Sequence, residues 1–199
     1  MRRFVDIIVA FVALVILSPV LVVVALAVRI SSPGNPFYGG WRAGRGGRNF
    51  RMWKVRTMFN GAAKMGPITG KNDPRVTPLG RILRKTKLDE LPQFFNLLLG
   101  DMTLVGPRPE SPDIVALYTP SQRVVLAVKP GVTGKVQLDS DDESETLPEG
   151  PQAYDYYLAH VMDRKLRMDL EYLRARTFFT DVRIVLATAG LVFRAAARR

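Results

Sequence analysis

Two acidic side chains stand next to each other at Asp89 and Glu90, in the stretch TKLDELPQ. A basic run, RILRKTK, leads up to them, and an apolar run, FFNLLLG, follows. Pro92 is suited to the first turn of a helix, so we expect a helix from about Asp89 to Gly100. At the positive end of that helix dipole, among basic neighbours, both carboxylates are expected to stay ionised.

A charged and partly desolvated carboxylate is a credible covalent nucleophile toward phosphorus. Its neighbour could hold Mg²⁺ that bridges to a diphosphate, so Asp89 and Glu90 are both candidate metal ligands. A structural role stays open, because acidic residues are common in the first turn of a helix. Glycoside hydrolysis fits poorly, since it needs carboxyl groups roughly 5–9.5 Å apart across a sugar. Adjacent residues on a helix point in different directions.

Arg108 stands between Pro107 and Pro109 in the stretch GPRPE. The two prolines fix the backbone on either side, so the guanidinium can be aimed with little loss of entropy. The fork of an arginine matches the oxygens of a phosphate. Arg108 is therefore a candidate phosphate ligand, and the alternative is a rigid surface turn with a solvated arginine.

Three further basic residues could add positive charge to such a site. Lys54 and Arg56 share one face of a predicted strand within residues 41–58, and Arg75 follows the turn signal NDP. Each is a candidate substrate ligand, and each could equally be a solvated surface charge.

The sequence contains no cysteine and a single histidine, His160. Disulfides, thiolate catalysis and cysteine-bound zinc are therefore excluded. A Ser-His-Asp triad would have to use His160, and no GxSxG elbow accompanies it, so we predict a structural role for this histidine. A bound metal must then be held mainly by oxygen, which indicates Mg²⁺.

The elements that would position these residues form one domain of the α+β class, mostly helical with a small β element. Residues 31–40 are predicted to be a turn-rich linker, and residues 59–78 a loop. Helices are predicted through Leu79, Ile82 and Leu83, then over 89–100, 113–127 and 153–176 and along the C-terminal tail. Short strands are predicted within 41–58, 101–110 and 129–138, and residues 139–151 read as an acidic loop.

An apolar run from Ile7 to Val28 is interrupted only by Ser18 and Pro19. Its length suffices to cross a bilayer, while its apolar core is too long for a signal peptide. Arginines flank it on both sides, and both flanks therefore favour the cytoplasm. Pro19 breaks helical hydrogen bonding and a serine hydroxyl can satisfy freed backbone groups. We therefore favour a re-entrant helix that returns to the same face over a straight, kinked span.

Charge separates the chain into the same two parts. The whole chain carries a net charge of +11, of which residues 1–28 contribute +1 and the remainder +10. A basic domain beside a membrane segment suggests anionic headgroups or an anionic substrate at the bilayer surface. We thus predict a re-entrant membrane helix over residues 1–30 and a cytoplasmic catalytic domain over residues 31–199.

The C-terminal tail, DVRIVLATAGLVFRAAARR, is predicted to be a basic amphipathic helix. It could be a core helix with a basic end, but a membrane-interfacial position is favoured by the anchor at the other end of the chain. In that position its apolar residues insert and its arginines contact headgroups; the residues concerned are Leu191, Val192, Phe193, Arg194, Arg198 and Arg199.

The chain resembles the monotopic phosphoglycosyl transferases, the bacterial sugar transferase family. The matching stretches run in the order typical of the family and cover most of residues 2–137, with a looser match at DLEY (169–172). They are RRFVD, SP, RAGRGGRNF, KVRTM, NDPRVTPLGRILRKTKLDELPQFFNLLLGDMTLVGPRP and KPGVTGKVQ. The spacing LDELPQ-x7-DM-x3-GPRP is long and distinctive.

The resemblance implies transfer of a phospho-sugar from a nucleotide diphosphate sugar, usually a UDP-sugar, to undecaprenyl phosphate, with Mg²⁺ as cofactor. It implies that Asp89 attacks the sugar-proximal phosphate, that UMP leaves, and that the polyprenol phosphate then attacks the phosphosugar-enzyme. Glu90 would assist and Arg108 would contact phosphate. The Ser18–Pro19 break would form a re-entrant helix on the cytoplasmic face of the bacterial inner membrane, in a short form of the family.

The sequence departs from the family at three places. Many members continue the PGxTG stretch as WAQVNGRN, whereas this chain reads KVQLDSDDESE and has no arginine before Arg164. Lys87 stands where members often have serine, and Gly40 where they often have glutamine. The motifs do not distinguish one sugar, glycoconjugate pathway or oligomeric state from another.

A non-enzymatic function remains as the alternative. The basic domain could be a membrane-anchored module that binds anionic lipid or nucleic acid with a steep salt dependence. Aromatic and basic residues alternate only around Trp53, and no helix-turn-helix or RNP signature is present, so we expect no nucleic-acid partner.

Overall fold

The computed structural model describes residues 2–62, 66, 68–139, 146–150 and 152–197, and the side chains as far as Leu191. The protein is mostly helical with two small sheets, as predicted. Its strands are β1 (Phe37–Ala43), β2 (Asn49–Val55), β3 (Thr103–Val105) and β4 (Gly131–Thr133). The longer helices are α1 (Arg2–Ser31), α2 (Pro78–Lys85), α8 (Met162–Arg174) and α9 (Phe178–Ala197).

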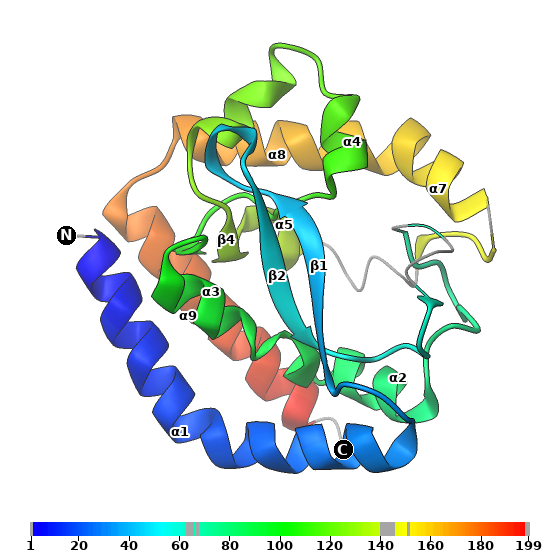
Figure 1. The fold of residues 1–199 in the computed structure, drawn as a ribbon. Helices are drawn as coiled ribbons and strands as arrows, with labels where there is room; N and C mark the ends of the chain where they lie inside the picture. Colours follow the sequence, from blue (N-terminus) through cyan, green and yellow to red (C-terminus); the bar gives the residue numbers. More distant parts are fainter. Residues whose placement is uncertain (1, 63–65, 67, 140–145, 151, 198–199) are drawn as a thin grey trace.

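Shorter helices complete the chain. They are α3 (Gln93–Leu99), α4 (Pro112–Ala116), α5 (Lys135–Asp139) and α7 (Gln152–Tyr156), with 3₁₀ turns at η1 (Arg45–Gly47), η3 (Leu88–Glu90) and η4 (Gln122–Ala127) and a π-helical turn at η5 (Tyr157–Val161). Figure 1 shows the β1–β2 hairpin crossing the middle of the molecule, with α7 and α8 across one end and α1 along the opposite edge.

Several predicted element boundaries were wrong. The predicted linker contains the start of β1, and the single strand predicted within 41–58 is a two-stranded antiparallel hairpin. The helix predicted from Asp89 begins only at Gln93. Residues 113–127 divide into α4 and η4, and the strand predicted through 129–138 ends at Thr133, after which α5 begins. The acidic loop falls largely on residues 140–145 and 151, which lie outside the described residues.

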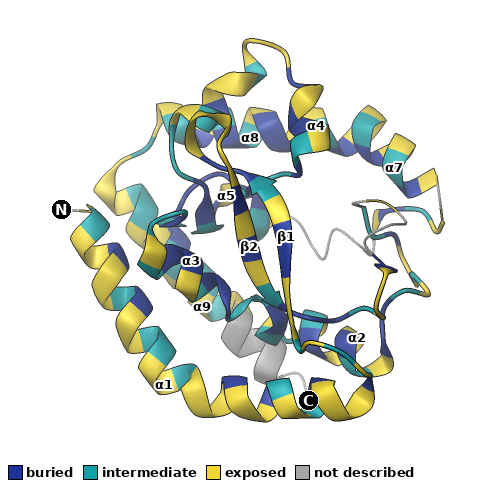
Figure 2. Cartoon of the chain, viewed as in Figure 1, coloured by how far each residue is buried: buried dark blue, intermediate teal, exposed yellow. Residues whose placement is uncertain are grey.

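Helix α1 is continuous through Pro19 but bends sharply near its middle (Figure 1). A proline inside a helix removes one hydrogen bond and clashes with the preceding turn, which is the usual cause of such a kink. The Ser18 hydroxyl donates to the carbonyl of Val15 at 2.9 Å. By length and composition alone α1 could cross a membrane, and only 17% of its most apolar window is buried; Figure 2 shows its outer face exposed.

Both halves of α1 pack against the same domain. In the first half, Arg3 donates to the carbonyls of Leu97 and Leu98 at the end of α3. In the second half, apolar side chains form a buried cluster with residues of β2 and α2; its members are Leu21, Val24, Val28, Val55 and Leu83. The two ends of the helix are therefore fixed to one body.

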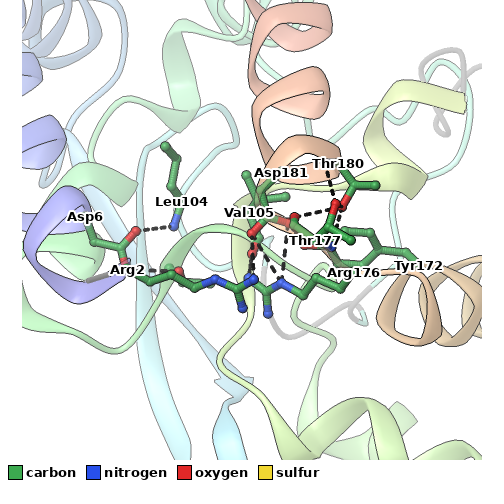
Figure 3. A network of polar contacts seen from close by, with 10 residues as sticks. Arg2, Asp6, Leu104, Val105, Tyr172, Arg176, Thr177, Thr180 and Asp181 are labelled. Carbon is green, nitrogen blue, oxygen red and sulfur yellow. Dashed lines mark hydrogen bonds and ion pairs between the residues drawn. The ribbon is translucent and has the colours of Figure 1, made fainter.

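The first turn of α1 also joins a polar network (Figure 3). Asp6 is buried and accepts from the Thr103 hydroxyl at 2.9 Å and from the Leu104 N–H at 3.0 Å. Arg2 reaches Asp181 of α9 at 3.6 Å, and Asp181 also accepts from the Tyr172 hydroxyl at 2.6 Å. These contacts tie the start of α1 to β3, the strand that leads into the Pro107–Pro109 turn.

Helix α2 begins as its sequence predicts. The Thr77 hydroxyl accepts from the Gly80 N–H at 2.9 Å, and Pro78 occupies the first turn, where no donor is needed. Gly80 lies so close to β2 that a Cβ there would be 2.1 Å from the Thr57 carbonyl oxygen. A larger residue at this position would push α2, and the turn that follows it, away from the hairpin.

Candidate active site

Asp89 and Glu90 lie in the 3₁₀ turn η3, between α2 and α3. Lys87 precedes it with a left-handed backbone (φ 57°), which turns the chain out of α2. The neighbouring Leu88 and Leu91 pack against the buried cluster formed with the second half of α1. The acidic pair thus lies beside an apolar cluster that the second half of α1 helps to form, and not on a helix N-terminus as we expected.

Glu90 draws together side chains from three elements. Its Oε1 is 3.1 Å from Nζ of Lys54 on β2 and 2.6 Å from Nη2 of Arg108, while Nη1 of Arg108 lies 3.5 Å from Oε2. Burial by itself raises the pKa of Glu90, but Arg108 and Lys54 outweigh that effect and hold the pKa well below its usual range. Glu90 is therefore a fixed anion between two cations.

Asp89 has the opposite environment. Its side chain is buried, and in the described part of the chain Oδ1 has no hydrogen-bond partner. Burial raises the pKa of Asp89 above its ordinary value, although Lys54 opposes this shift. The expected effect of the helix dipole is wrong for this carboxylate, because α3 begins four residues later, and burial shifts the pKa in the direction opposite to the one we expected. A desolvated carboxylate is more basic than a solvated one and a better nucleophile once ionised.

The acidic pair borders a cavity of about 670 Å³, within the range of small-molecule sites. Its walls come from the hairpin, the loop before α2, the η3 turn, the Pro107–Pro109 turn and the start of α8. Among the polar side chains that line it are Arg42, Lys54, Asp89, Glu90, Arg108, Glu110 and Lys165. A space of this size and polarity can accept a nucleotide sugar.

Of the predicted ligands, Lys54, Glu90 and Arg108 lie together, whereas Arg56 and Arg75 bind backbone carbonyls of the surrounding loops. Lys54, Glu90 and Arg108 form one cluster beside Asp89, and Pro109 lines the cavity. The Pro107 carbonyl accepts from the Gly131 N–H at 2.9 Å, so it fixes the turn to β4.

Arg56 lies just beyond the end of β2, and its guanidinium donates to the carbonyl of Ser32 at 2.7 Å and to that of Pro33 at 2.6 Å. It therefore anchors the end of α1. Arg75 pairs with Asp73 at 2.6 Å and donates to carbonyls of the loop before it, those of Ala62, Gly66 and Ile68. Both arginines border the cavity, but these contacts occupy their guanidinium groups.

The sequence reading missed a second polar cluster in the cavity wall. Glu110 accepts from the Tyr157 hydroxyl and from Nζ of Lys165, the latter at 2.9 Å, and Lys165 also donates to Tyr157 at 3.0 Å. Lys165 and Glu110 are far apart in the chain, so no local pattern could have paired them. His160 is exposed, stacks on Tyr156 at 4.6 Å between ring centroids, and does not line the cavity.

The protein alone supplies only part of the ligand set that a magnesium ion needs. Within the described residues, no group of three or more acidic or histidine side chains could hold a metal. Asp89 Oδ1 is nevertheless a buried carboxylate oxygen without a partner, next to a second carboxylate. Mg²⁺ is usually held by one or two carboxylates together with substrate phosphates, and Asp89 with Glu90 meets that requirement.

Comparisons with known proteins show the family to which the chain belongs. A family model described as bacterial sugar transferase matches residues 1–195. The UDP-glucose:undecaprenyl-phosphate glucose-1-phosphate transferase of Escherichia coli K12 is 37% identical over 206 residues, which cover 98% of this chain and 41% of that protein. The undecaprenyl-phosphate galactose phosphotransferase of Salmonella typhimurium is 35% identical, covering 98% of this chain and 40% of that protein.

A third relative is named as a UDP-glucose:undecaprenyl-phosphate glucose-1-phosphate transferase from Caulobacter vibrioides. It is 33% identical over 193 residues, which cover 94% of this chain and 67% of the relative. The chain thus spans well under half the length of the Escherichia coli and Salmonella relatives and two thirds of the Caulobacter one. The relatives differ in the sugar for which they are named, glucose in two of them and galactose in the third.

Proposed function

The chain belongs to the bacterial sugar transferase family. From this premise and the geometry of its cavity we propose that it transfers a sugar 1-phosphate from a nucleotide diphosphate sugar, a UDP-sugar, to undecaprenyl phosphate. The reaction releases UMP and is the first membrane step in building a glycoconjugate or polysaccharide. The observation that carries the proposal is Asp89: a buried carboxylate with an unpartnered oxygen, beside an anion held by two cations, on a cavity wall.

In the first step, a carboxylate oxygen of Asp89 attacks the sugar-proximal phosphorus. A bond forms between that oxygen and phosphorus, and the bond from phosphorus to the bridging oxygen breaks, so that UMP leaves with the electron pair. The product is a phosphosugar-aspartyl intermediate. Arg108 and Lys54 lie where they can bind the oxygens of the attacked phosphate, because Glu90 holds both beside Asp89.

In the second step, a phosphate oxygen of undecaprenyl phosphate attacks the same phosphorus and the Asp89 carboxylate leaves. The acceptor phosphate is anionic at neutral pH and needs no general base. Leu88 and Leu91 of the η3 turn pack against the apolar cluster to which Leu21, Val24 and Val28 of α1 belong, which supports a reacting carboxylate close to the apolar helix. That arrangement suits a lipid acceptor whose phosphate must reach the site from a bilayer.

Asp89 and Glu90 are the residues that would hold Mg²⁺, together with oxygens of the diphosphate. When bound, the ion neutralises charge on the diphosphate and so favours attack by an anion. Glu90 also has a task of its own, since its charge aligns Lys54 and Arg108 from different elements.

The membrane arrangement follows from how α1 is held. Arg3 at its start and Val28 near its end both contact the domain that carries the active site. A helix that crossed the bilayer would separate these two points by the membrane thickness of about 30 Å. A kinked helix that enters and leaves on one face keeps both contacts, and the arginines on both flanks favour the cytoplasmic side for that face.

The test is substitution of the nucleophile in the full chain. Asp89→Asn is expected to abolish UMP release from a panel of nucleotide sugars with Mg²⁺ and undecaprenyl phosphate, and to abolish the mass shift of a phosphosugar-enzyme. Asp155→Asn, which changes an exposed aspartate on α7, is the matched control and should keep both. UMP release that persists in Asp89→Asn contradicts the assignment.

The non-enzymatic alternative gives different results in the same samples. A basic module that binds anionic lipid would respond steeply to salt and would ignore both Mg²⁺ and the identity of the sugar. Wild-type protein that binds anionic vesicles but releases no UMP from any nucleotide sugar supports that alternative.

A further inference from the structure

Arg42 is a cavity residue that the proposed steps leave without a task. It lies on β1, and the hairpin register pairs Tyr38 with Lys54, Gly40 with Met52 and Arg42 with Phe50. Directly opposed residues of an antiparallel pair share a face, as do alternate residues of one strand. Arg42 therefore lies on the same face of the hairpin as Lys54, the cation that contacts Glu90.

The guanidinium of Arg42 extends over Gly40, toward the Tyr38–Lys54 pair. A Cβ on Gly40 would be 3.1 Å from Cε1 of Tyr38 and 3.6 Å from Nη1 of Arg42. The arginine therefore leans back along the strand over the glycine, toward the tyrosine ring. Gly40 is two residues from the Tyr38–Lys54 pair, a distance of about 7 Å along a strand.

The charge of Arg42 has no ion-pair partner among the described residues. Among the described residues its guanidinium makes one hydrogen bond, from Nη1 to the carbonyl of Trp41 at 2.8 Å, and no ion pair. The nearby carboxylate is Glu110, which Lys165 and Tyr157 already engage. Burial lowers the pKa of Arg42, and Glu110 only partly opposes this shift. Arg42 thus brings a partly desolvated cation with unused donors to the cavity.

We propose that Arg42 binds the nucleotide-side phosphate of the donor, the phosphate that departs with the nucleoside. This inference rests on the proposed function. Arg108 and Lys54 lie with Glu90 beside Asp89 and so contact the phosphate under attack. The guanidinium of Arg42, about two residues farther along the hairpin face, meets the neighbouring phosphate of the same diphosphate. That phosphate gains negative charge as the bridging bond breaks, and a fixed cation there stabilises the leaving group.

The test compares the binding of UMP and of uridine to the full-length protein in detergent, by titration calorimetry. Arg42→Gln is expected to weaken UMP binding about 10- to 100-fold, the effect of losing charge-assisted hydrogen bonds, and to leave uridine binding unchanged. Arg42→Lys, which keeps the charge but loses the fork, is expected to fall between wild type and Arg42→Gln. Arg48→Gln, at an exposed arginine of the same hairpin, is the matched control and should bind UMP like wild type.

Two results overturn the inference. Unchanged UMP affinity in Arg42→Gln does so outright, and an equal loss of UMP and uridine binding shows that Arg42 only supports the hairpin or Tyr38. If Arg42→Gln has a lower melting temperature than Arg48→Gln, the affinities for UMP and uridine are compared in Arg42→Lys instead. If wild type binds UMP and turns over a UDP-sugar, and Arg42→Gln also binds UMP normally, only this inference fails and the proposed function stands. Wild-type protein that neither binds UMP nor releases it defeats the proposed function.

Discussion

At the scale of single residues, the two neighbouring carboxylates of the site differ in their surroundings and therefore in the direction of their pKa shifts. Glu90 has its pKa held well below the usual range by Arg108 and Lys54, against the effect of its burial, whereas burial raises the pKa of Asp89. Pairs of titratable groups whose environments push their pKa values apart commonly have different tasks in catalysis. Here the stable anion organises the cations, and the more basic carboxylate is available to react.

The raised pKa of Asp89 predicts the acid limb of the pH profile. Attack requires the ionised form, so kcat/KM should fall on acidification at a pH above the ordinary aspartate value of about 3.9. Lys54 lowers the pKa of Asp89, and Lys54→Met should therefore move the acid limb to higher pH as well as reduce the rate. The measurement is UMP release as a function of pH.

Lys85→Met is the control for this shift, since Lys85 is an exposed lysine of α2. It should leave the acid limb in place. An acid limb that lies at the same pH in wild type and Lys54→Met would show that Asp89 is not the group whose ionisation is observed.

At the scale of elements, the kink in α1 decides where its first half goes. Pro19→Ala restores a hydrogen bond and removes the clash that bends the helix, so a straighter helix should leave the contacts made by Arg3 and Asp6. We expect a lower melting temperature and an N-terminal tag that becomes protected from protease added to the cytoplasmic side of vesicles. Val20→Ala, at the exposed next position, should leave tag accessibility unchanged. Tags with equal accessibility in Pro19→Ala and wild type would refute this account of the kink.

Helix α8 contains a buried acid that predicts how stability changes with pH. Burial raises the pKa of Asp169 to about 7, against an ordinary value of about 3.9. Between these values the folded protein holds a proton that the unfolded chain has lost, so this contribution to stability decreases as pH rises, by at most about 1.4 kcal/mol per pH unit. Below pH 4 the contribution is fully present, and above pH 7 it has been lost.

Asp169→Asn removes this titration. Its melting temperature should therefore decline less between pH 5 and pH 8 than that of wild type, while Glu171→Gln, at an exposed acid of the same helix, should decline as wild type does. Parallel declines in wild type and Asp169→Asn would mean that Asp169 is ionised in the folded protein throughout this range.

At the scale of the whole molecule, exposed apolar side chains are concentrated on a few helices. The largest group of them lies along α1, whose outer face is exposed (Figure 2). Others lie on α3 and at the start of α9; those with the greatest exposure are Phe95, Leu99, Phe178, Phe179 and Leu186. Surfaces of this kind mark contact with a membrane or another protein. The arginines predicted to flank the apolar tail, Arg194, Arg198 and Arg199, and the inserted Val192 and Phe193 lie outside the described side chains.

The apolar start of α9 gives a prediction about membrane association. Phe179 is 75% exposed, and Phe179→Glu places a charge where burial in the interface would be favourable. We expect weaker retention of the protein in a carbonate-washed membrane fraction. Tyr156→Glu, at an exposed aromatic residue of α7, is the control. Equal retention of the two variants would remove α9 from the membrane-facing surface.

The sequence predicted the residue types of the candidate site better than their arrangement in space. Asp89, Glu90 and Arg108 stand in local motifs whose residue types already imply phosphate chemistry, and α2 carries its own capping signals. The hairpin was missed because a strand that begins in a glycine-rich stretch, as β1 does, has no alternating pattern. Lys165 and Arg42 were missed because their place in the cavity depends on contacts between distant segments. The ionisation of Asp89 was misjudged because burial cannot be read from neighbouring residues.

The contacts of the first turn of α1 also fix an order of events during synthesis. The chain is made from its N-terminus, yet Asp6 obtains its hydrogen bonds only from Thr103 and Leu104, and Arg2 meets Asp181. At roughly 5–20 residues per second, the ribosome needs about 5–20 s to supply the partners of Asp6. Until then Asp6 lacks the partners that it has in the folded protein. The final packing of the start of α1 is therefore a late event, which the C-terminal half of the polypeptide completes.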